Sequence, residues 1–303
     1  MKASADQAAF RVAIQGRPYS NSHAAAAILA PGAEIKYCDR SEEVFEAVTN
    51  GAGECAVIAV ENALAGAVNV SFDLLYQHNL YINGETRIRI EHALIAPPGG
   101  TLQDIRVAYS HPVALEQCRR FFIEHREIEQ RPAYDTAGAV EMVIQDRAKY
   151  PNSAGIANRA AAEGYGGVVL LDNIEDSPDN FTRFFLVSRE PRFPSTENRY
   201  KLSVLYVVDD APGALVRSLR PFGDRAINIA KFENRPIKGT PFQYWFYLDA
   251  LCEPGNHAAM DEALADLERA SKTMRLLGRY RVYPYKENAQ TKGGTNGSHD
   301  HPS

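Results

Sequence analysis

Two polar segments in this sequence stand where an α/β fold usually places its ligand groups. Glu61 and Asn62 directly follow the apolar run 55–60, and Ser110 follows the predicted strand 105–109. Ligands of open α/β sheets bind beyond the carboxyl ends of the strands, so these side chains are candidates to hold a polar substrate. Asn62 could equally serve as the N-cap of a helix, as asparagine often does at such a boundary.

A third polar segment spans residues 180–184, in which Thr182 follows one phenylalanine and Arg183 precedes the next. The threonine hydroxyl can donate or accept a hydrogen bond beside a guanidinium, which suits a substrate that carries carboxylates. Taken alone, a threonine on a strand is more often structural. A predicted helix start at Thr136 could present backbone N–H groups to such a carboxylate.

Several kinds of chemistry are not indicated. The four cysteines, at positions 38, 55, 118 and 252, form no CxxC pair, so neither a zinc site nor a disulfide framework is expected. The sequence contains no GxGxxG, GxxxxGKS, HExxH or GxSxG motif. Nucleotide-binding, zinc-protease and serine-hydrolase functions are therefore not supported by motifs.

The composition of the chain indicates which kinds of binding partner are not expected. The net charge is −5 and the isoelectric point is about 5.9, which argues against nucleic acid because phosphate binding needs a concentrated basic surface. The polar start 1–7 does not resemble a signal peptide, and the apolar runs are too short to span a membrane. A cytoplasmic protein with reduced thiols and no membrane partner is expected.

Strand and helix patterns alternate through the first two thirds of the chain, which predicts an α/β fold with a mostly parallel sheet. Longer strands in 80–95 cross to a second αβ lobe, so the candidate residues above would face a cleft between two lobes. We expect one domain over 9–190, with one lobe formed by 9–95 and 170–190 and the other by 96–169.

The pattern restarts after a polar linker at 190–198. Residues 200–285 are expected to form strands and helices in the order βαββαβ, a ferredoxin-like plait. The tail 286–303 is rich in glycine, serine, asparagine and histidine, and is expected to be disordered.

Taken together, these segments resemble the prephenate dehydratase family, which includes arogenate dehydratases. The matching segments, in the family's order, are Val60-Glu61-Asn62, Tyr109-Ser110-His111-Pro112 with Gln117, Asp135-Thr136-Ala137, Ala154-Gly155-Ile156-Ala157, and Asn173 to Asp176 with Asn180 to Phe184. The resemblance implies a two-lobed catalytic domain like the type-II periplasmic binding proteins. It implies conversion of prephenate to phenylpyruvate in L-phenylalanine biosynthesis by a lyase without metal or organic cofactor.

The resemblance also implies roles for individual residues. Thr182 would lie at the leaving hydroxyl, and Asn62, Ser110 and Gln117 would position the substrate. The remaining residues expected at the substrate site are Glu61, Ser22, Thr136, Arg183 and Phe184. Of these, Glu61 and Arg183 would hold the geometry of the site rather than touch the substrate.

The C-terminal part resembles an ACT domain, which implies regulation by phenylalanine and a homodimer or homotetramer. The expected phenylalanine-binding residues are Gly213, Ala214, Leu215, Val216, Asn228, Glu233, Asn234, Arg235 and Pro236. Asn234 stands where the family usually has serine.

The loop 16–22 departs from the family's first motif, because Tyr19 replaces a glycine and Asn21 replaces an aromatic residue. Ala63 also stands where serine is usual. Two alternatives therefore remain beside prephenate dehydratase: an arogenate dehydratase, and a non-catalytic protein that binds or senses an amino acid on the same scaffold.

Overall fold

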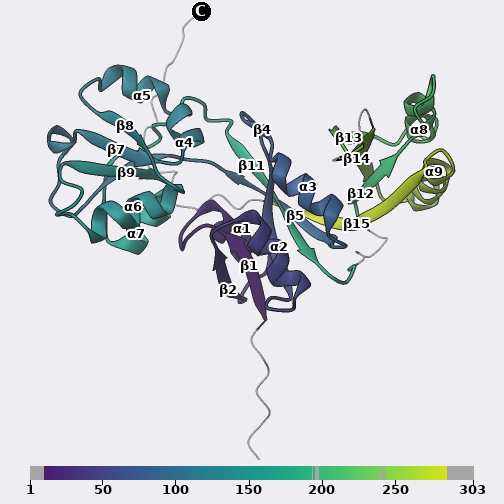
Figure 1. The fold of residues 1–303 in the computed structure, drawn as a ribbon, viewed down its shortest axis with the longest axis horizontal. Helices are drawn as coiled ribbons and strands as arrows, with labels where there is room; N and C mark the ends of the chain where they lie inside the picture. The colour runs from purple at the N-terminus through teal and green to yellow at the C-terminus, as the bar shows by residue number, and fades with distance from the viewer. Residues whose placement is uncertain (1–9, 193, 195–197, 238, 241–242, 285–303) are drawn as a thin grey trace, which may run out of the picture.

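The computed structural model of the chain describes residues 10–192, 194, 198–237, 239–240 and 243–284. The predicted disordered tail lies outside these residues. Figure 1 shows three parts in a row: a central N-terminal lobe in purple and blue, a second lobe in teal, and a C-terminal module in green and yellow.

The N-terminal lobe contains the strand order β2-β1-β3-β11-β5. Strand β1 pairs in parallel with β2 and β3, whereas β11 runs antiparallel to β3 and β5. The strands are β1 (Arg11–Gln15), β2 (Glu34–Cys38), β3 (Cys55–Asn62), β5 (Tyr81–Arg89) and β11 (Phe181–Ser188), with the two-residue β4 (Gly66–Ala67) beside β3. Within this lobe the predicted parallel arrangement therefore holds for β1, β2 and β3.

Three helices cover this sheet: α1 (Asn21–Leu29), α2 (Ser41–Thr49) and α3 (Asn69–Gln77). Helix α1 begins because the Ser20 hydroxyl accepts a hydrogen bond from the His23 N–H and so satisfies a free donor of the first turn. The N-cap is thus Ser20, and Ser22 lies in the first turn of the helix.

The second lobe is a five-stranded sheet of order β10-β6-β9-β7-β8. Its strands are β6 (Ala93–Ala96), β7 (Val107–Ser110), β8 (Glu129–Pro132), β9 (Ser153–Ala157) and β10 (Val168–Leu171). In this lobe the predicted parallel arrangement holds for β7, β8 and β9. Its helices are the short 3₁₀ turn η1 (Leu102–Asp104), α4 (Pro112–Glu116), α5 (Arg119–Glu124), α6 (Thr136–Gln145) and α7 (Arg159–Tyr165).

Two chain segments cross between the lobes and hydrogen-bond to each other there. The Ile174 N–H donates to the His92 carbonyl at 2.9 Å, and the Ile90 N–H donates to the Asn180 carbonyl at 2.7 Å. Because β6 and β10 belong to the second sheet, the lobes meet near residues 90 and 180 rather than 95 and 170. Both crossings are polar in the sequence: the first contains Glu91 and His92, and the second spans residues 172–180.

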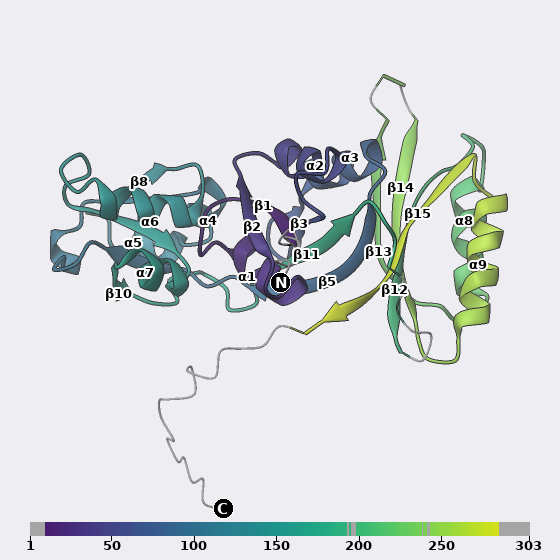
Figure 2. The same cartoon turned by 90° about the horizontal axis from the view of Figure 1, so that it is seen from below.

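The C-terminal module has the order β12, α8, β13, β14, α9, β15, which is the predicted βαββαβ. The elements are β12 (Tyr200–Val207), α8 (Ala214–Gly223), β13 (Ile229–Pro236), β14 (Tyr244–Cys252), α9 (His257–Arg269) and β15 (Thr273–Tyr283). Figure 2 shows α8 and α9 together on the face of the module's sheet that points away from the N-terminal lobe.

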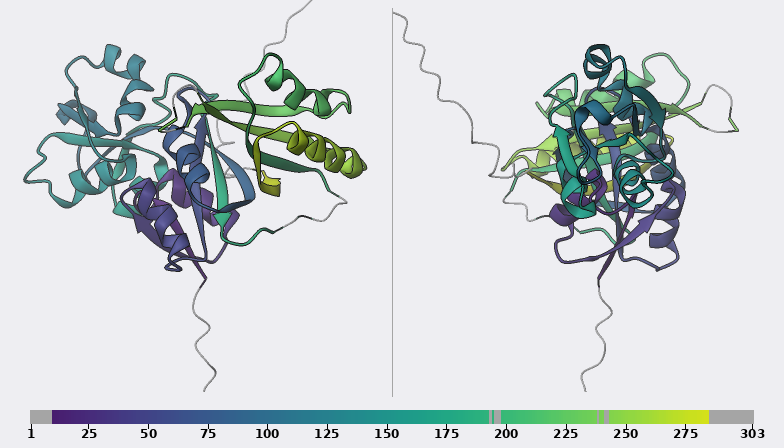
Figure 3. Two further views of the ribbon diagram at one scale, coloured as in Figure 1. Left: turned by 45° about the vertical axis from the view of Figure 1, so that its right-hand side comes forward. Right: turned by 90° about the vertical axis from the view of Figure 1, so that its left-hand side faces the viewer.

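The module's sheet is continuous with that of the N-terminal lobe, because β15 pairs in parallel with β5. One buried cluster spans the junction, with Phe72 and Phe185 from the lobe and Trp245, Tyr247 and Leu277 from the module. Figure 3 shows the module packed against the central lobe from two further sides.

No helix among the described residues is long and apolar enough to cross a membrane.

Candidate active site

Thr182 and Asn62 form the centre of the site. They lie directly opposite each other on the antiparallel strands β11 and β3, so their side chains project from the same face of the sheet. The Asn62 Nδ2 lies 3.0 Å from the Thr182 Oγ1. The fold therefore brings together two predicted site residues that lie 120 positions apart in the sequence.

Backbone contacts fix which way the Asn62 amide points. Its Oδ1 accepts hydrogen bonds from the N–H groups of Leu64 at 3.0 Å and Ala65 at 2.8 Å, so the other terminal atom is the NH₂ nitrogen. The NH₂ nitrogen can donate hydrogen bonds but cannot accept them, so the Thr182 oxygen must be the acceptor. The hydroxyl proton of Thr182 is left free to donate elsewhere.

The same logic fixes a ring of three amides. Asn62 Nδ2 donates to Asn180 Oδ1 at 2.8 Å, so the NH₂ of Asn180 is the group that donates to Gln117 Oε1 at 2.9 Å. Gln117 Oε1 is then an acceptor. The His92 Nε2 atom, 3.1 Å from it, must therefore carry a proton and donate it to this oxygen. The Gln117 NH₂ group is turned toward Asn62 Oδ1, 3.4 Å away.

His92 and Asn180 are site residues that the sequence did not single out, although Asn180 opens the segment that contains Thr182. Both are buried. The Nδ1 of His92 has no hydrogen-bond partner among the described residues. A lone histidine outside any motif gave no signal, because only the fold brings it from the lobe crossing to Gln117.

Burial lowers the pKa of His92 below its ordinary value of about 6.5, while smaller effects of Gln117 and Glu175 oppose this. The folded protein therefore binds fewer protons than the unfolded chain below pH 6.5. We expect the free energy of unfolding to fall as the pH drops below that value. His92 contributes at most about 1.4 kcal/mol per pH unit.

Urea unfolding at pH 7.5 and 5.5 tests this, with His92→Gln as the matched variant that keeps a donor near Gln117. Burial also lowers the pKa of His23 and His111, so some acid sensitivity will remain in the variant. An equal loss of stability in both proteins would contradict the assignment to His92.

The other residues predicted to bind the substrate lie in different parts of the structure, and not all of them are at the cleft. Ser110 is fully buried, and its hydroxyl donates to the Ile156 carbonyl at 2.6 Å within the second sheet. Its expected role in positioning the substrate is corrected, because its hydroxyl proton is donated to the Ile156 carbonyl and is not available to a substrate carboxylate. Thr136 begins α6 and Ser22 lies in the first turn of α1, so both are at helix N-termini, which favour anions.

Glu61, Arg183 and Phe184 do not lie with Thr182. Side chains alternate along a strand, so Arg183 and its opposite residue Glu61 project from the other face of the sheet. Arg183 is 7 % exposed and is bound to Glu85 and Asp249, and Phe184 is buried in the core of the N-terminal lobe. Their assignment as substrate-binding residues is corrected for this reason, whereas the expected role of Glu61 and Arg183 in holding the geometry of the site stays a prediction.

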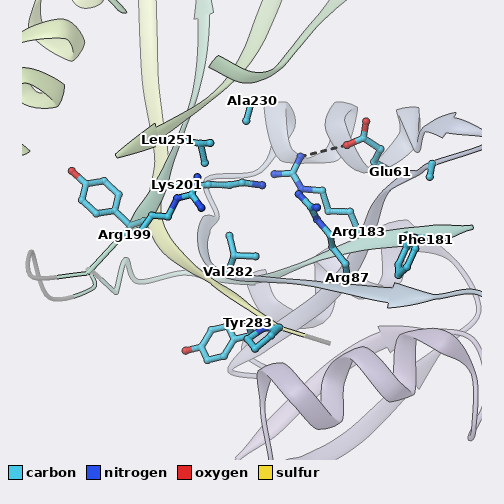
Figure 4. Close-up of a pocket in the computed structure, with 13 residues that line it drawn as sticks. Glu61, Arg87, Phe181, Arg183, Arg199, Lys201, Ala230, Leu251, Val282 and Tyr283 are labelled. Atoms are coloured by element: carbon cyan, nitrogen blue, oxygen red, sulfur yellow. Dashed lines mark hydrogen bonds and ion pairs between the residues drawn. The ribbon is translucent and has the colours of Figure 1, made fainter. Parts of the chain in front are cut away.

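A cavity of about 900 Å³ opens on this second face, between the N-terminal lobe and the C-terminal module. In Figure 4, Arg183, Arg87 and Lys201 point into it. Its cations lie beside carboxylates: Lys201 bonds Glu85 at 2.7 Å, and Arg199 bonds Glu253 at 2.9 Å. It is not the substrate site indicated by Thr182.

The unusual loop around Tyr19 connects the two lobes. Tyr19 adopts φ 65°, a left-handed conformation that glycine takes at little cost, at the position where the family has glycine. Its carbonyl accepts from Asn158 at 3.0 Å, and the Pro18 carbonyl accepts from Tyr165 at 3.2 Å. The Tyr19 ring also packs edge-on against Tyr165, with ring centroids 5.2 Å apart, so the departure from the family motif adds a side-chain contact across the lobes.

In the C-terminal module, Gly213 adopts φ 73° and caps α8, which begins with Ala214, Leu215 and Val216. The predicted ligand residues Glu233, Asn234 and Pro236 lie on the edge strand β13, and Asn228 lies just before it. These assignments stay predictions.

Arg235 is different from the other residues of its segment. It makes a two-pronged salt bridge to Asp73 of α3, with contacts of 3.0 to 3.2 Å. Its predicted role in binding phenylalanine is corrected, because the guanidinium is engaged with the N-terminal lobe.

No group of three or more histidine, cysteine, aspartate or glutamate side chains within the described part of the chain could hold a metal ion. The four cysteines are free and buried.

Comparisons with known proteins agree with this geometry. The Arabidopsis thaliana protein named arogenate dehydratase/prephenate dehydratase 2, chloroplastic, is 34% identical over 281 residues, which cover 90% of this chain and 73% of that protein. A solved prephenate dehydratase from Arthrobacter aurescens in complex with L-Phe is 30% identical, with a TM-score of 0.80 and 89% of each chain covered. A structure described as "GqqA- a novel type of quorum quenching acylases" is 33% identical, with a TM-score of 0.80, and covers 90% of this chain and 98% of its own.

The relatives contradict the expected cytoplasmic location, since three similar Arabidopsis proteins are named chloroplastic. The family model described as prephenate dehydratase matches residues 12–192, which contain Thr182, Asn62 and Gln117. The chain therefore belongs to the prephenate dehydratase family.

Proposed function

We propose that this chain is a carbon–oxygen lyase that converts prephenate to phenylpyruvate, water and carbon dioxide. Family membership supports the proposal. Within the site, the observation that carries it is the hydrogen bond from Asn62 to Thr182, which leaves the threonine proton free for a departing hydroxyl.

The reaction needs a proton donor rather than a strong base. As the carboxylate leaves as carbon dioxide, its bonding electron pair enters the ring, the carbon–oxygen bond breaks, and the ring becomes aromatic. The hydroxyl must gain a proton to leave as water, and that proton comes in net from the solvent. Thr182 would donate a hydrogen bond to that oxygen, and the Gln117 NH₂ group beside Asn62 would hold the substrate in register.

The substrate's two carboxylates require positive potential from both sides of the cleft. The N-termini of α1, near Ser22, and α6, near Thr136, belong to different lobes and provide such potential without a metal or cofactor. Closure of the lobes on the substrate would bring both helix ends to it.

The test is formation of phenylpyruvate from prephenate by the purified chain, with arogenate assayed beside it. Arogenate is a candidate substrate because it appears in the names of the plant relatives. The ratio of kcat/KM for the two substrates decides between them. Calorimetric binding of prephenate without any turnover would favour the non-catalytic alternative, and failure of both substrates would contradict the proposal.

Acyl hydrolysis is a second candidate, since the chain is 33% identical to the structure described as a quorum quenching acylase. The same preparation should be offered an acylated quorum-sensing signal. Release of the free acid, in the absence of turnover of prephenate or arogenate, would favour this function.

We also propose that residues 9–190 form the catalytic domain and that residues 200–285 form an ACT domain, which binds L-phenylalanine and pairs two chains into a dimer or tetramer. The phenylalanine complex of the Arthrobacter relative and the βαββαβ order support this. Calorimetry with phenylalanine, inhibition assays and light scattering test the ligand, its effect and the oligomer. Phenylalanine that neither binds nor inhibits would contradict the regulatory proposal.

A further inference from the structure

The residues next to the Thr182–Asn62 pair connect the site to the C-terminal module. One step along the same two strands, Arg183 lies opposite Glu61, and both project from the face opposite Thr182. The register shifts between Arg183 and Phe184, so a bulge lies immediately beside these two pairs. Bulges of this kind re-aim neighbouring side chains, and they often occur at active sites.

Three strands of the module hold this second pair. Lys231 on β13 donates to Glu61 Oε1 at 2.8 Å, and Asp249 on β14 accepts from Arg183. The Tyr280 hydroxyl on β15 lies 3.5 Å from the same guanidinium. Arg183 Nη1 and Glu61 are also joined directly at 3.5 Å, as the dashed line in Figure 4 shows.

The network is balanced in charge and mostly buried. Three cations, Arg183, Lys201 and Lys231, face three carboxylates, Glu61, Glu85 and Asp249. One further charge of each sign lies at the edge of the network, where Glu233 pairs with Lys231 and Arg87 pairs with Glu85. Charges in such an interior are weakly screened, and a shift of one group away from its partner is opposed strongly. The backbone of β3 and β11 at the site is thus tied to the position of β13 and β14.

We propose that Lys231 and Asp249 of the C-terminal module are positioning residues for the reaction at Thr182. They act through Glu61 and Arg183, which set the orientation of the adjoining residues Asn62 and Thr182. This inference rests on the proposed dehydratase function. It also gives a ligand on the module a physical route to the site, because any shift of β13 or β14 changes the Asn62–Thr182 geometry, and a 1 Å misplacement costs on the order of 100-fold in rate.

Lys231→Met is the test, since it removes the ammonium and keeps the aliphatic stem. The Glu61 side chain is 33% exposed, so its carboxylate can be hydrated and the fold should persist. We expect kcat to fall by roughly 10- to 100-fold with KM changed less than about threefold, because geometry in the transition state is lost rather than substrate binding. Lys231→Arg restores a cation and should recover most of kcat.

Asp73→Asn is the matched control. It breaks the salt bridge to Arg235, which crosses the same boundary from the same strand as Lys231, four residues further along. Asp73 lies on α3 and contacts neither β3 nor β11 through this pair. We expect its kcat to stay within about twofold of wild type while thermal stability falls, as for an ordinary interface contact.

The outcomes are separable. Wild-type kcat in Lys231→Met, an equal loss in Asp73→Asn, or no recovery in Lys231→Arg would each overturn the positioning role while leaving the dehydratase function standing. A wild-type protein that turns over neither prephenate nor arogenate would overturn both.

Discussion

Replacing Thr182 with valine is expected to lower kcat for prephenate by about 10²- to 10⁴-fold, the range typical for loss of a positioned proton donor. Valine keeps the shape and β-branching of threonine and so suits the strand. Only the hydroxyl is removed, and with it the proton that the Asn62 contact leaves free. Asn62 retains acceptors for its NH₂ group in Asn180 and the Phe181 carbonyl.

Steady-state kinetics with Thr182→Ser as the control measures this. Serine keeps the hydroxyl and should retain a substantial part of kcat, although its freer rotamer places the oxygen less well. Circular dichroism and the urea midpoint should show that valine leaves the fold intact. A valine variant that keeps more than a tenth of wild-type kcat would remove Thr182 from the chemistry.

Part of this site was accessible from the sequence. The apolar run before Asn62 marked a strand end, whereas a hydroxyl beside a guanidinium marked the segment of Thr182. The antiparallel pairing that makes these two residues neighbours is a contact across 120 positions, which local patterns do not encode. His92 was missed for the same reason, since it meets Gln117 only at the crossing between lobes.

The side of the strand on which Arg183 lies follows from the sequence. Thr182 and Arg183 are consecutive on a predicted strand, and consecutive side chains of a strand face opposite sides. If Thr182 faces the substrate, Arg183 faces away from it. The family resemblance groups the two residues in one motif. Because side chains alternate along a strand, however, only Thr182 can face the substrate, and Arg183 can act only by positioning its neighbours.

The docking of the C-terminal module could not be predicted. The polar linker and the restart of the pattern suggested an independent unit, and its helices do cover their own sheet. The other face of that sheet carries Trp245 and Tyr247, which bury against Phe72 of the N-terminal lobe. In sequence, such a face is indistinguishable from one that packs against a second chain.

Arg183→Met is expected to destabilise the protein by roughly 3–5 kcal/mol, the usual cost of leaving buried charges without their partner. Glu85 and Asp249 are both fully buried, and both are bound by this guanidinium. Lys201 still neutralises Glu85 at 2.7 Å, but Asp249 is left with hydroxyl donors alone. Methionine fills most of the arginine stem's volume, so the loss reflects charge rather than a cavity.

Urea unfolding of three variants at pH 7.5 tests the origin of this loss. Arg131→Met breaks the exposed pair with Glu129, in which both side chains are at least half exposed, and should cost no more than about 1 kcal/mol. The double variant Arg183→Met/Asp249→Leu removes the stranded carboxylate and should recover part of the stability. If the free energy of unfolding of the single Arg183→Met variant lies within about 1 kcal/mol of wild type, the network does not hold the module to the N-terminal lobe. Other groups would then be compensating the charges of Glu85 and Asp249.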